Sequence, residues 1–67
     1  MNKYQTWNSE TSEKSELVKH TSLAAAVVWV ETQIALHPRD NDDEGWRLQE
    51  VTGGAEMTLA ESRRQIS

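Results

Sequence analysis

The chain has 67 residues, no cysteine and a formal net charge of −4, with seven Lys and Arg against eleven Asp and Glu. At this length one small hydrophobic core only just offsets the conformational entropy of folding, so we expect a single small domain over residues 1–67. The lack of cysteine excludes a disulfide framework and a thiolate metal site. The acidic balance also argues against a nucleic-acid partner, because nonspecific phosphate binding requires a basic surface.

The longest apolar run covers residues 22–36 and contains Glu31. A helix that crosses a bilayer needs about 20 apolar residues, so the run predicts no membrane segment. The first twenty residues carry lysines and glutamates and lack the apolar stretch of a signal peptide. These features predict a cytoplasmic protein.

Two interpretations fit the polar N-terminal segment. The stretches "YQTWN" (residues 4–8) and "ELVKH" (16–20) favour two short strands around a polar turn. The low hydrophobicity and the Ser, Glu and Lys content are also typical of disorder. We favour the strands and keep disorder as the alternative, above all for residues 1–10.

A helix is predicted over residues 22–36. Its apolar stripe follows the spacing i, i+4, i+7, i+11 and consists of Leu23, Val27, Val30 and Ile34. The alternation of apolar residues over 28–36 also fits a strand. Ser22 as a cap, three successive alanines and Pro38 as a stop favour the helix, which should end near Leu36 because the residue before a proline avoids helical backbone angles.

The second half of the chain predicts a strand at 46–51, a glycine turn at 52–54, a short strand at 55–57 and a helix at 58–66. Thr58 and Glu61 have the spacing of a capping box at the start of that helix. We therefore expect a small α+β domain in which short antiparallel strands pack with two helices, at about 22–36 and 58–66.

The two predicted helices also indicate an internal repeat. Residues 22–31 align with residues 58–67, and a tryptophan, Trp7 or Trp46, precedes each copy. This pattern predicts a degenerate ββα repeat. The alternative is chance similarity between two capped helices.

An acidic loop, "RDNDDEG" at residues 39–45, partly fits a calcium-binding loop. Positions 1, 3, 5 and 6 of the pattern are Asp40, Asp42, Glu44 and Gly45. Position 12, which needs a bidentate glutamate, is Val51, and Glu50 falls one residue short. We interpret the segment as a solvated connecting loop without a metal; weak or specific cation binding is the alternative.

No pattern predicts an active site. His20 and His37 are the only imidazoles, and neither has a partner at metal-ligand spacing, so both are expected to be surface or capping residues. The serines, histidines and acids show no catalytic spacing, and a chain of this size offers little room for an enclosed pocket. We expect a protein that is not an enzyme and uses no cofactor.

The predicted helix at 22–36 is apolar on both sides. Opposite the core stripe, a helical projection groups Ala25, Trp29 and Leu36, with Val28 alongside. Either the N-terminal segment covers this second side, or it is a protein interface. We favour a protein-interaction or regulatory module that uses Ala25, Trp29 and Leu36, as a homodimer or as an accessory subunit.

A nucleic-acid-binding regulator is the alternative function. Its contacts would be Trp46, Arg47, Arg63 and Arg64, the largest gathering of aromatic and basic side chains in the second half of the chain. Arginines near the end of a helix are also simply favoured by the helix dipole.

Overall fold

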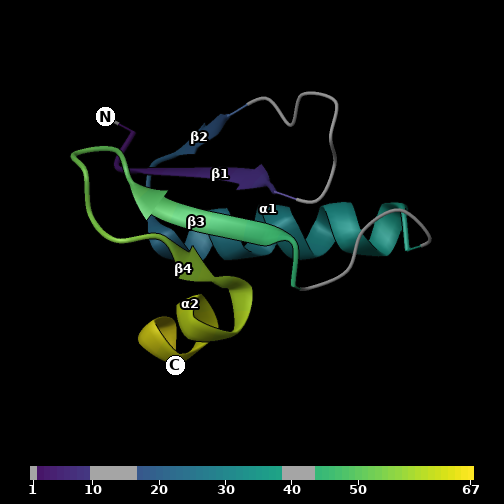
Figure 1. The fold of residues 1–67 in the computed structure, drawn as a ribbon. Coiled ribbons are helices and arrows are strands. Elements are labelled where there is room, and N and C mark those ends of the chain that lie inside the picture. The colour runs from purple at the N-terminus through teal and green to yellow at the C-terminus, as the bar shows by residue number, and fades with distance from the viewer. Residues whose placement is uncertain (1, 10–16, 39–43) are drawn as a thin grey trace.

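The computed structural model describes residues 2–9, 17–38 and 44–67. Its elements are β1 (Tyr4–Asn8), β2 (Val18–His20), α1 (Leu23–Leu36), β3 (Trp46–Glu50), β4 (Met57–Thr58) and α2 (Leu59–Ile66) (Figure 1). The strands form one antiparallel sheet in the order β2-β1-β3-β4. α1 runs across one face of the sheet, and α2 packs beside β4 and against α1. The predicted α+β class is confirmed.

The register of β1 and β3 gives the sheet two different faces. Facing residues of paired antiparallel strands project to the same side, and neighbours along a strand project to opposite sides. The side that packs against α1 carries Thr6, Asn8, Trp46 and Leu48, all of them buried. The other side carries Gln5, Trp7, Arg47 and Gln49. These four side chains are only partly buried, so this side forms surface.

α1 forms where the sequence predicts it. The Ser22 hydroxyl accepts a hydrogen bond of 3.1 Å from the amide of Ala25, which caps the first turn. At the other end the His37 amide donates to the Gln33 carbonyl. Leu23, Ala26, Val27 and Val30 are buried against the sheet, and Ile34 packs at their margin. The strand alternative for residues 28–36 is therefore wrong.

α2 begins with the predicted capping box. The Thr58 hydroxyl accepts from the Glu61 amide at 3.2 Å, and the Glu61 carboxylate accepts from the Thr58 amide at 3.1 Å. These hydrogen bonds lower the pKa of Glu61. Both helices start one residue later than predicted because Ser22 and Thr58 are their caps.

The order of elements is that of two successive ββα units. Each unit contributes one central strand, β1 or β3, and one outer strand, β2 or β4. The two tryptophans on which the repeat was predicted are not equivalent, however. Trp7 is the fourth residue of β1 and lies on the sheet side away from α1, whereas Trp46 is the first residue of β3 and lies in the core.

The core lies between α1, the sheet and the start of α2. It consists of Leu23, Ala26, Val27, Val30, Trp46, Leu48 and Leu59. Between β3 and β4 the chain turns at residues 51–53, where Gly53 has a φ of 107°, a value that favours glycine. The last strand begins at Met57, two residues later than the predicted start at Ala55.

Candidate binding surfaces

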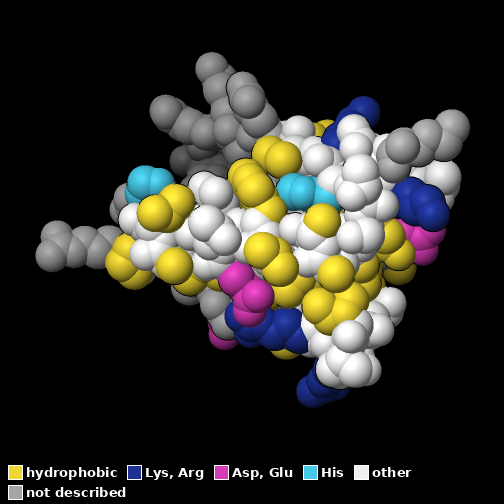
Figure 2. All heavy atoms as spheres, turned by 180° about the vertical axis from the view of Figure 1, so that it is seen from behind, with side chains coloured by type: hydrophobic (Ala, Val, Ile, Leu, Met, Phe, Trp, Pro, Cys, Tyr) yellow, Lys and Arg dark blue, Asp and Glu magenta, His cyan; other side chains and the backbone are white. Residues whose placement is uncertain are grey.

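The outer side of α1 is an exposed apolar surface. We call it the α1 face; its apolar members are Ala24, Ala25, Val28, Ala35 and Leu36. Val28 is 62% exposed and Leu36 is 64% exposed. Figure 2 views the molecule from this side and shows hydrophobic side chains spread across it. Ala25 and Leu36, two of the residues predicted for a protein contact, are exposed.

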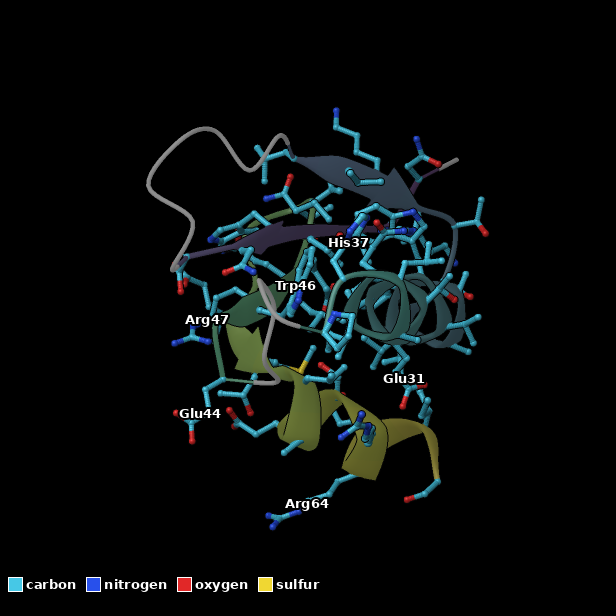
Figure 3. The ribbon with its side chains drawn as sticks, turned by 90° about the vertical axis from the view of Figure 1, so that its right-hand side faces the viewer. Glu31, His37, Glu44, Trp46, Arg47 and Arg64 are labelled. Carbon is cyan, nitrogen blue, oxygen red and sulfur yellow. The ribbon has the colours of Figure 1, made fainter. Side chains whose placement is uncertain are left out.

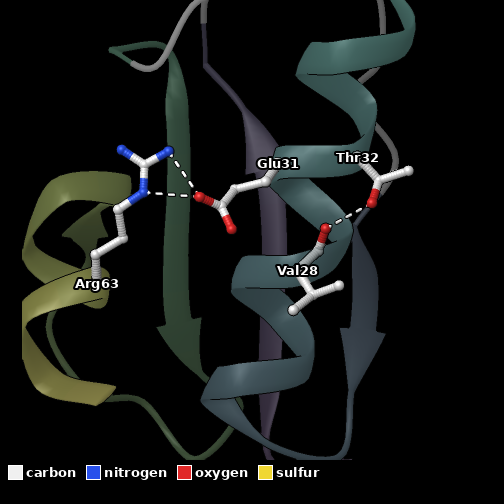
Figure 4. A network of polar contacts seen from close by, with 4 residues as sticks. All are labelled: Val28, Glu31, Thr32 and Arg63. Atoms are coloured by element: carbon white, nitrogen blue, oxygen red, sulfur yellow. Dashed lines mark hydrogen bonds and ion pairs between the residues drawn. The ribbon is translucent and has the colours of Figure 1, made fainter. Parts of the chain in front are cut away.

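Glu31 and Thr32 interrupt the α1 face, but both are engaged within the protein (Figure 4). The Glu31 carboxylate forms an ion pair of 2.9 Å with the Arg63 guanidinium of α2. The Thr32 hydroxyl donates to the Val28 carbonyl at 2.8 Å. Glu31 is the only charged residue of α1. The face therefore presents little uncompensated polarity to a partner.

Trp29 does not lie with Ala25 and Leu36 in the open part of this face. Its ring is half-buried and packs against the sheet, 5.4 Å from the His20 ring and 5.6 Å from the Trp46 ring, measured between centroids. A helical projection gives only the direction of the Cα–Cβ bond, and a side chain as long as tryptophan reaches sideways onto the sheet. Val28 takes its place as the large exposed residue of the middle of α1.

His20 is buried, so the prediction that it is a surface or capping residue is wrong. It faces Tyr4 across the β1–β2 pair and therefore projects toward α1. Only 8% of the residue is exposed, and its Nε2 atom lies 3.0 Å from the Thr6 hydroxyl. Burial disfavours the charged imidazolium and lowers the pKa of His20 below its usual 6.5. His37, in contrast, is the exposed C-cap residue of α1, as predicted.

Lowering the pH from about 7.5 to about 5 is expected to destabilise the protein through His20. The pKa of His20 is lower in the folded chain than in the unfolded chain, so the unfolded chain binds more protons as the pH falls. The contribution of neutral His20 to the free energy of unfolding is fully present above the pKa that His20 has in the unfolded chain. It is lost as the pH falls through the lower pKa that His20 has in the folded chain. Urea unfolding followed at several pH values measures this loss.

The variant His20→Gln should flatten the dependence of unfolding free energy on pH in this range. Equal slopes for the unmodified protein and His20→Gln would contradict the assignment to His20.

The side of the sheet away from α1 is the second candidate surface. We call it the open sheet face; it carries Gln5, Trp7, Lys19, Arg47 and Gln49. In the described ranges no helix covers it (Figure 1). The Gln5 amide donates to the Gln49 amide oxygen at 3.0 Å, and Gln49 in turn donates to the Gly54 carbonyl at 2.7 Å. Arg47 donates to the backbone carbonyls of Glu44 and Trp46.

The four residues predicted for nucleic-acid contact do not share a surface. Trp46 is only 6% exposed and lies in the core, and Figure 3 shows it pointing toward α1 while Arg47 points away from the sheet. Arg63 is paired with Glu31 on the α1 side, and Arg64 projects from α2 away from the rest of the protein. Trp46 is therefore unavailable as a surface contact, and the predicted cluster is corrected to one surface arginine on the sheet and two on a helix.

The acidic loop falls largely outside the described residues, including Asp40 and Asp42. Gly45, at its end, is hydrogen-bonded to Ser9, the residue that follows β1: the Gly45 carbonyl accepts from the Ser9 amide at 2.7 Å and from the Ser9 hydroxyl at 2.8 Å. Among the residues that the structure describes, no three His, Asp or Glu side chains are grouped so that they could hold a metal ion.

A shallow hollow of about 320 Å³ lies at one end of the sheet. It is lined by Asn2, Lys3, Tyr4, Glu50 and Thr52. One cation and one carboxylate at its rim do not amount to a nucleophile with its base, so the hollow carries no catalytic assignment.

Comparison of the chain with protein-family models, with curated proteins and with solved structures finds no match. Within residues 2–9, 17–38 and 44–67 no helix is long and apolar enough to cross a membrane.

Proposed function

We propose that the protein is a non-enzymatic, cytoplasmic protein-interaction module that acts through the α1 face and associates with a second copy of itself. The observation that supports this most directly is the exposure of Val28 and Leu36, each above 60%, on a helix with one charged residue. Contiguous exposed apolar surface is characteristic of protein contact sites.

Folding alone does not account for these two side chains. The residues of α1 that build the core lie on its opposite side and are already buried, so Val28 and Leu36 gain little from the fold. Complete burial of a Val or Leu side chain contributes about 1.5 to 3 kcal/mol. A partner that covers the α1 face supplies that burial.

The small side chains of the face suit a second copy of α1. Ala24, Ala25 and Ala35 allow two helices to approach closely, with Val28 and Leu36 as the larger groups between them. Two-fold symmetry uses the same patch on both chains. The Glu31–Arg63 pair is partly exposed and contributes little energy, so it sets orientation more than affinity.

The size of the face indicates weak association. A standard interface takes about 800 Å² from each partner, roughly a sixth of the 4658 Å² surface of this chain. One side of a 14-residue helix supplies less than that. We therefore expect a dissociation constant in the micromolar range or weaker. This corresponds to a binding free energy of about −8 kcal/mol or a weaker one.

The double variant Val28→Gln/Leu36→Gln is expected to be monomeric and folded. Sedimentation velocity at concentrations on the order of 10 to 500 µM should show a monomer–dimer equilibrium for the unmodified protein and a monomer for the variant. Glutamine is a good helix former, so the melting temperature should be nearly unchanged.

Val51→Gln is the control for this test, because Val51 is an exposed aliphatic residue in the β3–β4 turn, away from α1. It should dimerise like the unmodified protein. Raising the salt from about 50 to about 200 mM should barely weaken an association driven by apolar burial. An unmodified protein that stays monomeric at the highest concentration would rule out self-association.

A further inference from the structure

Charge is segregated between the two sides of the sheet. Among the described strand residues the only carboxylate is Glu50, which faces Tyr4 and so projects to the α1 side. The open sheet face carries Lys19 and Arg47 together with two amides and one indole. Although the whole chain has a net charge of −4, the strand side chains on this face are all neutral or positive.

The burial of side chains along β1 is the reverse of the usual pattern, in which polar groups are exposed and large apolar groups are buried. Thr6 and Asn8, which are polar, are buried at 0% and 4% exposure, whereas the large Trp7 lies on the open side. The buried Thr6 hydroxyl is accommodated by its hydrogen bond to His20. Positions where local preference is violated in this way are often functional sites.

The register brings the chemically useful groups of this face together. Trp7 lies directly opposite Arg47, and Gln5 lies between Lys19 and Gln49. Directly opposed Cβ atoms in an antiparallel pair are about 5 Å apart, and the two rows are separated by two residues, about 7 Å. An indole, two cations and two amides thus share a surface a few nucleotides wide.

We propose that the open sheet face binds single-stranded nucleic acid, with a base stacked on Trp7 and phosphates held by Lys19 and Arg47. Stacking on an aromatic ring next to cationic side chains is the general means by which sheet surfaces hold single strands. The Gln5–Gln49 amides supply hydrogen-bonding groups for a base edge.

The composition of the face favours this ligand over an apolar protein surface. Its strand side chains include no aliphatic residue, in contrast with the α1 face on the other side of the molecule. Arg47 donates hydrogen bonds to the backbone carbonyls of Glu44 and Trp46, which are neutral acceptors. The hydrogen bonds from Thr58 lower the pKa of Glu61 most, and the charges of Arg64 and Arg47 add to this, so a carboxylate of α2 partly offsets the charge of Arg47.

Tryptophan fluorescence gives a direct test, since Trp29 and Trp46 pack against each other at the core while Trp7 lies on the open side. Titration with 15-nucleotide oligothymidylate or oligouridylate should quench the emission, and duplex DNA of the same length should not. With two phosphates neutralised, the affinity should fall about sevenfold between about 50 and 200 mM salt. Because Trp7→Ala removes the reporting indole, its binding is measured by the fluorescence anisotropy of a dye-labelled oligonucleotide. It should be weaker than that of the unmodified protein by at least about fivefold, the loss of one stacked base.

Lys19→Glu keeps the test decisive if Trp7→Ala is poorly folded, because Lys19 is an exposed side chain of the outer strand β2. Arg64→Glu on α2 is the matched control, since each variant lowers the net charge by two. Lys19→Glu should abolish detectable quenching, and Arg64→Glu should weaken it only slightly.

Three results would overturn the proposal: no quenching by either oligonucleotide at low salt, equal losses in Lys19→Glu and Arg64→Glu, or a dimer that dissociates in Lys19→Glu. The last result would assign the open sheet face to a second copy of the chain. The double variant Val28→Gln/Leu36→Gln should bind the oligonucleotides like the unmodified protein. The proposal for the open sheet face and the proposal for the α1 face are therefore tested independently.

Discussion

Replacing Leu48 with alanine is expected to lower the free energy of unfolding by about 2 to 5 kcal/mol. Leu48 is fully buried in the central strand β3, beneath α1, and is among the largest completely buried side chains. A domain of this length has a total stability on the order of 3 to 10 kcal/mol. The variant should therefore lose a large fraction of its stability, which urea unfolding followed by circular dichroism would show as a lower urea midpoint.

Leu36→Ala is the matched control, since it removes the same atoms from a side chain that is 64% exposed. We expect its stability to stay within about 0.5 kcal/mol of that of the unmodified protein. If the two variants lost equal stability, Leu36 would be part of the folding core and the α1 face would lose one of its two large residues.

Replacing Trp46 with alanine should lower the free energy of unfolding by about 3 to 5 kcal/mol, the range for large aromatic residues in a core. Trp46 is 6% exposed, and Trp29 meets it in an edge-to-face arrangement at 5.6 Å. Its removal leaves a cavity beside Trp29 and frees that ring to move. We expect a lower urea midpoint and loss of the near-ultraviolet circular dichroism of the tryptophans.

Trp7→Ala provides the comparison for Trp46→Ala, because the same substitution is made one strand away on the open sheet face. Loss of the half-buried Trp7 ring should lower the free energy of unfolding by about 1 to 2 kcal/mol, clearly less than the loss expected for Trp46→Ala. A larger loss for Trp7→Ala than for Trp46→Ala would mean that the core lies on the other side of the sheet from α1.

The pairing of buried His20 with Thr6 shows why the surface residues were harder to predict than the elements. Whether a histidine at the end of a three-residue strand is buried depends on its register with β1, where it faces Tyr4. A one-residue slip in that register would send the side chain to the opposite side. No local pattern in "ELVKH" records the register, because the partner strand is separated by a long connection.

The two tryptophans of the strands make the same point for binding. Both precede or occupy predicted strands, and the sequence favoured Trp46 as a contact because Arg47 is adjacent. Adjacent residues in a strand project to opposite sides, so the pair is split between core and surface. The tryptophan that shares a side with Arg47 is Trp7, which lies forty residues away in the chain and directly opposite in the sheet.

Local chemistry was sufficient to predict both helices, their caps at Ser22 and Thr58, the core stripe of α1 and the α+β class. These features depend on residues within a few positions of one another, where spacing and capping act directly. The sides on which Trp7, His20, Trp29 and Trp46 lie were settled by strand pairing and by packing between α1 and the sheet. Such contacts join residues distant in sequence, and their energies depend on neighbours that a single linear pattern does not specify.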